Sequence, residues 1–273
     1  MITIIFAPPR TGKTCFMTHM ANITAFDRSR TRLMEAEIKR KQATGFTNIK
    51  TIPQHCVSAN YNLTLRKFGY SPRHNRRINP FRLGFTNKYV DTHFNLPYEA
   101  IFITEAQTYL NSRMSKYFPD WQSRWYEQDG HNNIDVWLDV QRPGLIDVNV
   151  RDLSQAIEIV KLHKEYDGFG RPCRFVWDIR RIDIGLCDRY IASGKKDSGC
   201  YTEDVVVANY NVFECYDSQS CKPKFYEGHF EDDFDYEESE IVDDTFDGYV
   251  DYLKKAYDEY QDKFYIKGNG KVA

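Results

Sequence analysis

Residues 2–14 have the sequence ITIIFAPPRTGKT. The first part, Ile2–Phe6, is apolar and mostly β-branched, which predicts a short strand buried in a parallel sheet. The second part, Ala7–Thr14, ends in the Gly-Lys-Thr of the phosphate-binding pattern G-x-x-x-x-G-K-[ST], with Ala7 at the position of its first glycine. We therefore expect a strand, a phosphate-binding loop and a helix that begins near Gly12.

This loop predicts nucleotide binding through its backbone and two side chains. Backbone N–H groups and the start of the helix surround a phosphate, Lys13 bridges the β- and γ-phosphates, and the Thr14 hydroxyl binds Mg²⁺. Ala7 is less permissive than glycine, and the two prolines make the loop stiff and remove two N–H donors. The expected cofactors are ATP and Mg²⁺, and the cofactor-binding candidates are Ala7, Pro8, Pro9, Arg10, Thr11, Gly12, Lys13, Thr14 and Cys15.

Two further buried strands are predicted to end in polar residues. Ala100–Thr104 is followed by Glu105, which is placed to hold Mg²⁺ and orient water; the alternative is a glutamate that only starts a helix. Ile134–Gln141 ends in Gln141, which in a parallel-sheet nucleotidase would lie beside the γ-phosphate and sense it or position water. The alternative for Gln141 is a polar residue that contacts backbone at the end of a strand.

Charged residues within and after Ile134–Gln141 give further candidates. Asp135 and Asp139 are less attractive, because both lie within the strand rather than at its end. An arginine is expected to contact phosphate, and Arg142 and Arg151 rank above Arg113 and Arg124 because they follow this strand. The predicted catalytic residues are Glu105, Gln141, Arg151 and Arg142, and the predicted metal ligands are Thr14 and Glu105.

The rest of the chain favours an α/β fold, because strands alternate with helices. Hydrophobic residues make up 41% of the 273 residues, enough to bury the core of one large domain. The further elements expected are helices at Arg28–Gln42 and Asp120–Gln128, a strand at His55–Ala59, an irregular basic insertion at Asn62–Asn95, and a β-hairpin formed by Ala156–Leu162 and Arg171–Ile184.

Charge is segregated along the chain although the net charge is only −2. Arg28 to Lys88 contains fourteen Lys or Arg and two acids, whereas Tyr226 to Tyr252 contains twelve acids and no Lys or Arg. This predicts a polyanionic partner or an acidic tail, with solvated faces of opposite sign as the alternative. We expect an ATPase domain at 1–225 and, at 226–273, an acidic linker with an amphipathic helix that docks on the core or binds a partner.

Cysteine spacing and hydropathy exclude several classes. The seven Cys show no CxxC spacing, which argues against a disulfide framework or zinc ribbon and favours reduced cytosolic thiols. Ile2–Phe6 lacks the basic flank of a signal peptide, and no run of apolar residues predicts a transmembrane helix.

Seven segments, taken in order, carry a resemblance to a known family. They are Ala7–Thr14, Val57–Tyr61, Ile103–Gln107, His131–Gln141, Ile146, Val150–Leu153 and Val212–Ser218. Together they resemble the N-terminal ATPase domain of the zonula occludens toxin (Zot) family, which includes filamentous-phage assembly ATPases. The resemblance covers Met1 to Ser218.

The resemblance implies a P-loop NTPase with a RecA-like parallel sheet that contains an additional strand and is flanked by helices. It also implies assembly into a homo-oligomeric ring and a role in phage morphogenesis or extrusion of single-stranded DNA. The expected location is the host cytoplasm or the inner face of the cell membrane, with membrane contact through a partner protein. Three features depart from the family: Thr104 stands where its members carry Asp, only His131 of their Arg-His pair is present, and an acidic stretch and an amphipathic helix replace their transmembrane helix.

Three functions therefore remain open. The first is an ATP-driven phage morphogenesis motor. The second is a DNA-packaging or conjugation-like translocase, which differs in the direction of DNA movement. The third is a nucleotide-binding assembly scaffold with weak turnover, which the absence of an acid at Thr104 favours.

Overall fold

The computed structural model describes residues 1–44, 55–67, 69–78, 80, 83, 97–113, 120–128 and 133–216. Its helices are α1 (Lys13–Ala25), α2 (Arg28–Ala43), α3 (Asp120–Gln128), α4 (Val148–Asp152) and α5 (Cys187–Ala192). Its strands are β1 (Ile2–Phe6), β2 (Val57–Ala59), β3 (Thr64–Leu65), β4 (Arg73–His74), β5 (Arg76–Arg77), β6 (Ala100–Ile103), β7 (Asp135–Val140), β8 (Ser154–Tyr166), β9 (Pro172–Ile182) and β10 (Tyr201–Asn209). The predicted unit at 226–273 and His131 lie outside the described residues.

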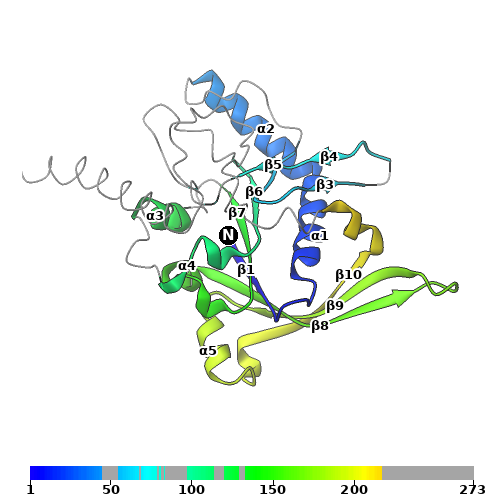
Figure 1. The fold of residues 1–273 in the computed structure, drawn as a ribbon. Coiled ribbons are helices and arrows are strands. Elements are labelled where there is room, and N and C mark those ends of the chain that lie inside the picture. Colours follow the sequence, from blue (N-terminus) through cyan, green and yellow to red (C-terminus); the bar gives the residue numbers. More distant parts are fainter. Residues whose placement is uncertain are drawn as a thin grey trace, which may run out of the picture.

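One eight-stranded sheet organises the fold, in the order β10-β9-β8-β1-β7-β6-β2-β5 (Figure 1). The strands from β8 to β5 are parallel, whereas β9 and β10 pair antiparallel at one edge. β7 lies between β1 and β6, so one strand separates the strand before the loop from the strand that precedes Glu105. This confirms the predicted α/β fold class with its additional strand.

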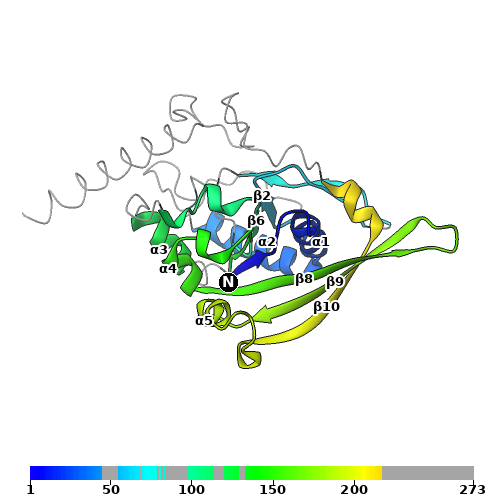
Figure 2. The same ribbon diagram turned by 60° about the horizontal axis from the view of Figure 1, so that its bottom comes forward.

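Helices cover both faces of the sheet. Successive residues of β1 point to opposite faces, so its side chains pack against helices on both sides. Ile4 packs in a cluster that includes Tyr126 of α3 and Tyr190 of α5, while Ile5 packs in a second cluster with Phe16 of α1. Figure 2 shows α1 and α5 on opposite sides of β8. Burying an apolar side chain such as Ile4 or Ile5 contributes about 1.5–3 kcal/mol to the stability of the fold. β1 lies at the centre of the core because its side chains are packed on both faces.

The predicted hairpin is confirmed, and it is longer than expected. β8 and β9 pair antiparallel through most of their length, and the hairpin extends beyond the body of the molecule in Figure 1. The sequence missed β10, which pairs with β9. The reason is that Val205 and Val207 are exposed while Val206 is half-buried, so β10 shows no apolar–polar alternation.

The basic insertion predicted at Asn62–Asn95 is not wholly irregular. Its described part contains β3 and β4, which pair with each other, and β5, which pairs in parallel with β2 and extends the main sheet. That part of the prediction was wrong, because strands of two residues are too short to produce a periodic pattern. None of the described helices is long and apolar enough to cross a membrane.

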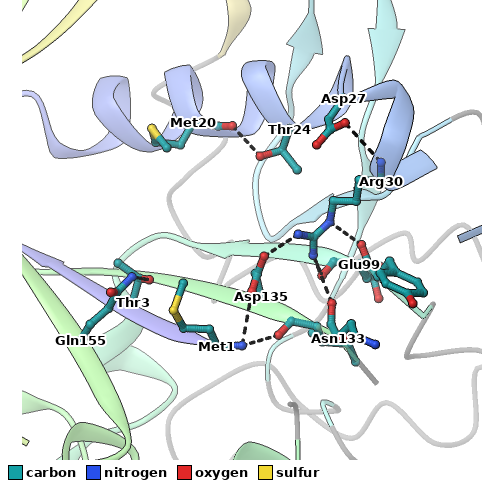
Figure 3. Close-up of polar contacts among 12 residues, drawn as sticks. Met1, Thr3, Met20, Thr24, Asp27, Arg30, Glu99, Asn133, Asp135 and Gln155 are labelled. Carbon is teal, nitrogen blue, oxygen red and sulfur yellow. Dashed lines mark hydrogen bonds and ion pairs between the residues drawn. The ribbon is translucent and has the colours of Figure 1, made fainter. Parts of the chain in front are cut away.

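Arg30 of α2 ties that helix to the amino-terminal ends of β6 and β7. Its guanidinium donates to the carbonyl oxygens of Tyr98 (2.6 Å), Glu99 (2.8 Å) and Asn133 (3.3 Å), and pairs with the Asp135 carboxylate at 2.5 Å (Figure 3). α2 begins at this point because the Asp27 side chain accepts the N–H groups of the first turn. Asp135 therefore has a structural partner at the amino-terminal end of β7, which is the end of the strand away from the loop.

Arg30→Met is expected to lower the free energy of unfolding by about 2–3 kcal/mol, since it removes the guanidinium that donates to three carbonyl oxygens and pairs with the half-buried Asp135 carboxylate. Thermal unfolding followed by circular dichroism measures the effect as a lower Tm. The control is Arg40→Met on the same helix, whose exposed pair with Glu37 contributes little to stability. Equal melting temperatures for the two variants would show that the Arg30 contacts do not stabilise the fold.

Candidate functional site

The loop between β1 and α1 requires glycine at position 12 for two reasons. Gly12 has φ +81°, in the left-handed region, and a Cβ there would lie 2.9 Å from the Leu162 side chain. Arg10 also has a positive φ, of 65°, and the Thr11 hydroxyl donates to the Pro8 carbonyl at 2.7 Å. The loop therefore turns tightly before α1 begins.

The side chain of Lys13 extends back into this loop. Its ammonium group donates to the carbonyl oxygens of Ala7 (3.1 Å) and Pro8 (3.3 Å), and the residue is only 7% exposed. It is also the first residue of α1, where the helix dipole and the N–H groups of the first turn favour an anion. The charge and the backbone donors thus occupy the same end of the helix.

The structure adds Asp139 to this group. Its carboxylate accepts the Thr14 hydroxyl at 3.1 Å and the backbone N–H of Glu105 at 3.3 Å, and the residue is 1% exposed. Burial raises the pKa of Asp139 to about 6; the nearby Lys13 opposes this rise and Glu105 adds to it. A single buried carboxylate therefore connects the loop helix with the end of β6.

Asp139 lies closer to the first turn of α1 than its position within a strand predicts. An acid inside a strand was expected to be poorly placed, yet Asp139 contacts the first turn of α1. The reason is the register: Ile5 pairs with Asp139, and the last residue of β1, Phe6, pairs with Val140. The first turn of α1 therefore lies over the last residues of β7, within hydrogen-bonding distance of Asp139.

Glu105 lies two residues after the end of β6 and has an unusual backbone conformation. Its φ and ψ are 51° and 43°, a left-handed conformation that disfavours residues with a Cβ by roughly 1–2 kcal/mol. Its carboxylate accepts a hydrogen bond from the Gln107 amide, and the residue is half-buried. Strained residues gather at functional sites, so this geometry supports a functional interpretation of Glu105.

The Thr104 side chain contacts Asn60 rather than Thr14. The backbone N–H of Thr104 donates to Asn60 Oδ1 at 2.9 Å, its hydroxyl reaches the same oxygen at 3.4 Å, and Asn60 Nδ2 donates to the Thr104 carbonyl at 3.1 Å. Both residues are buried. Asn60 thus joins the ends of β2 and β6, a role that no pattern in the sequence had indicated.

The other predicted residues are placed less decisively. Gln141 and Arg142 are both exposed and follow β7 directly. Arg151 of α4 is held by Asp188 of α5, with its Nε 2.8 Å from the Asp188 carboxylate, so Arg142 is the more available arginine. Cys15 is buried, and burial raises the pKa of its thiol to about 12, which leaves only its backbone for contact with a phosphate.

The oxygen donors of this site fit Mg²⁺ held together with a nucleotide. They are the Thr14 hydroxyl and the carboxylates of Asp139 and Glu105. Across the described residues, no cluster of three or more His, Cys, Asp or Glu side chains could hold a metal. Mg²⁺ does not require one, because it is usually bound through one or two carboxylates, phosphate oxygens and water.

Comparison with known proteins gives no match to a family model and none to a curated protein. Several solved structures are similar to this chain, including the following two. The N-terminal domain of zonular occludens toxin from Neisseria meningitidis is 16% identical, with a TM-score of 0.45, and the match covers 79% of this chain and 98% of that one. The genome packaging NTPase B204 from Sulfolobus turreted icosahedral virus 2 is 11% identical, with a TM-score of 0.36, over 75% of this chain and 94% of that one.

The first of these structures is a Zot domain, and the sequence resembles that family. At such low identities and TM-scores, the two similarities carry no weight for function.

Proposed function

We propose that this protein is a P-loop ATPase that binds ATP together with Mg²⁺ and hydrolyses it. One observation carries the proposal: Thr14 and Glu105 both contact Asp139 where the loop follows β1, and the Lys13 ammonium group lies in the same loop. A plain strand–turn–helix needs neither a buried lysine in its loop nor a buried acid beneath its helix. Burying such charged groups is unfavourable unless they serve a site.

Each residue has a role in this proposal. Lys13 exchanges its two loop carbonyls for the β- and γ-phosphate oxygens, which are stronger, charged acceptors. Thr14 would hold Mg²⁺, which when bound neutralises phosphate charge. Glu105 accepts a proton from the attacking water and is oriented by Gln107. Gln141 and Arg142, exposed beyond β7, contact the γ-phosphate side of the nucleotide.

For the biological role we propose a motor that assists assembly or extrusion of a single-stranded DNA phage, acting as a homo-oligomeric ring. The sequence resemblance supports this role, and so does the basic surface at the start of α2. There, three arginines and one acid line a pocket that also holds two aromatic rings: Arg28, Arg32, Arg73, Glu35, Phe26 and Tyr70. Arginines beside aromatic rings are suited to phosphates and bases of single strands. A DNA-packaging translocase is the second candidate, since the same surface would contact duplex phosphates.

Phosphate release by the full chain, with and without DNA, tests this function. We expect basal ATP hydrolysis that single-stranded DNA stimulates several-fold, and a stimulation that falls as salt rises. Equal or stronger stimulation by double-stranded DNA would favour the packaging translocase. ATP binding without phosphate release would favour the assembly scaffold, and no ATP binding would overturn the proposal.

A further inference from the structure

The acid that contacts Thr14 comes from β7 and not from the end of β6, where the resemblance predicts it. In the family that the sequence resembles, the acid is expected after Ile103, at position 104, where this chain has Thr. The carboxylate that accepts the Thr14 hydroxyl belongs instead to Asp139 of β7. The chain therefore retains an acid at the loop helix although the expected position lacks one.

The sheet register explains how one residue takes the place of the other. Ile103 of β6 pairs with Leu138 of β7, so Thr104 and Asp139 come next in the same row across the sheet. The same row continues to Ile5 of β1, which pairs with Asp139. Because neighbouring strands lie about 4.8 Å apart, the acid has moved by one strand towards the loop.

The contacts of both side chains agree with this exchange. Both oxygens of the Asp139 carboxylate accept hydrogen bonds, one from the Thr14 hydroxyl and the other from the Glu105 N–H. These two bonds fix the orientation of the carboxylate beside the first turn of α1. Thr104 is bound to Asn60 and carries no charge. Acids at both positions would place two carboxylates side by side in a buried row, where like charges oppose each other.

We propose that Asp139, together with Thr14, is the acidic ligand of the Mg²⁺ that accompanies the nucleotide, and that Thr104 has a structural role. This inference rests on the proposed function, because the ion is bound with the nucleotide. It removes the reason to regard this chain as a scaffold with weak turnover. The acid whose absence at position 104 favoured a scaffold is supplied from the neighbouring strand.

Nucleotide affinity measured with and without metal tests the proposal independently of turnover. Isothermal titration calorimetry with ATPγS compares the wild-type chain, Asp139→Asn and the control Asp152→Asn, which removes the same charge from an exposed position on α4. Mg²⁺ should tighten binding to the wild type and to the control by at least about tenfold. Asp139→Asn should keep its metal-free affinity within about threefold and lose most of the gain from Mg²⁺.

Mn²⁺ provides a spectroscopic readout of the same site. Electron paramagnetic resonance should show Mn²⁺ held by the wild-type chain with ATPγS, and at least about tenfold weaker retention by Asp139→Asn. If Asp139→Asn kept the full gain from Mg²⁺, Asp139 would not be the ligand, whereas the proposed ATPase would stand. If the wild type did not bind ATPγS at all, the proposed function would fail, and this inference with it.

A second variant decides the matter if Asp139→Asn does not fold. Thr104→Asp restores the acid at the position where the family carries it. We expect no gain in Mg²⁺-dependent binding, because Asp139 already supplies the acid and a second buried carboxylate beside it is opposed by the like charge. An increase of tenfold or more would identify position 104 as the metal-binding position and overturn the proposal.

Discussion

Replacing Lys13 with alanine is expected to weaken ATP binding by about 10- to 100-fold, the largest effect on affinity of any single change in this chain. Hydrogen bonds to charged groups are worth about 1.5–3 kcal/mol each, and the ammonium group is placed to make them with the β- and γ-phosphates. No other described lysine lies in the loop, so nothing replaces the lost charge. Fluorescence of a labelled ATP analogue, titrated with each protein, measures the dissociation constants.

Two variants make this measurement specific. Lys196→Ala removes the same charge from an exposed position and should bind ATP as the wild type does. Lys13→Arg keeps the charge, but its planar guanidinium is too bulky for the space where the ammonium group contacts two loop carbonyls, so we expect a partial loss. If Lys13→Ala bound ATP with unchanged affinity, the loop would not be the phosphate site.

Glu105→Gln is expected to reduce the rate of ATP hydrolysis by about 10²- to 10³-fold while changing ATP affinity by no more than about threefold. Glutamine has nearly the same shape and can still accept the hydrogen bond from the Gln107 amide, so the left-handed turn after β6 should persist. It cannot take a proton from water. Single-turnover phosphate release, combined with separately measured ATP affinity, distinguishes lost catalysis from lost binding.

The matched control is Glu127→Gln on the exposed face of α3, which should hydrolyse ATP at the wild-type rate. Together the variants assign separate roles, since Lys13→Ala affects affinity and Glu105→Gln affects turnover. Unchanged hydrolysis by Glu105→Gln would exclude Glu105 as the base and leave its role as the hydrogen-bond partner of Asp139 and Gln107.

Much of the fold could be predicted because its signals are local. The loop needs a glycine with positive φ, the buried strands β1 and β6 are short and mostly apolar, β7 alternates apolar residues with two acids, and the hairpin contains turn residues at its centre. α4, α5 and β10 were missed. α4 and α5 are only five and six residues long, and β10 lacks an alternating pattern. Short elements form through their tertiary contacts rather than through their own periodicity.

The site shows the same division. The sequence by itself determined the loop, the lysine and threonine that follow its glycine, and the glutamate that follows β6, because each depends on residues adjacent in the chain. Only the tertiary structure decided which acid contacts the threonine. Thr14 and Asp139 are 125 residues apart, and they meet because β7 pairs directly with β1 in a particular register. Strand order and register arise from packing across the whole sheet, so a carboxylate inside a strand became part of the site without any local signal.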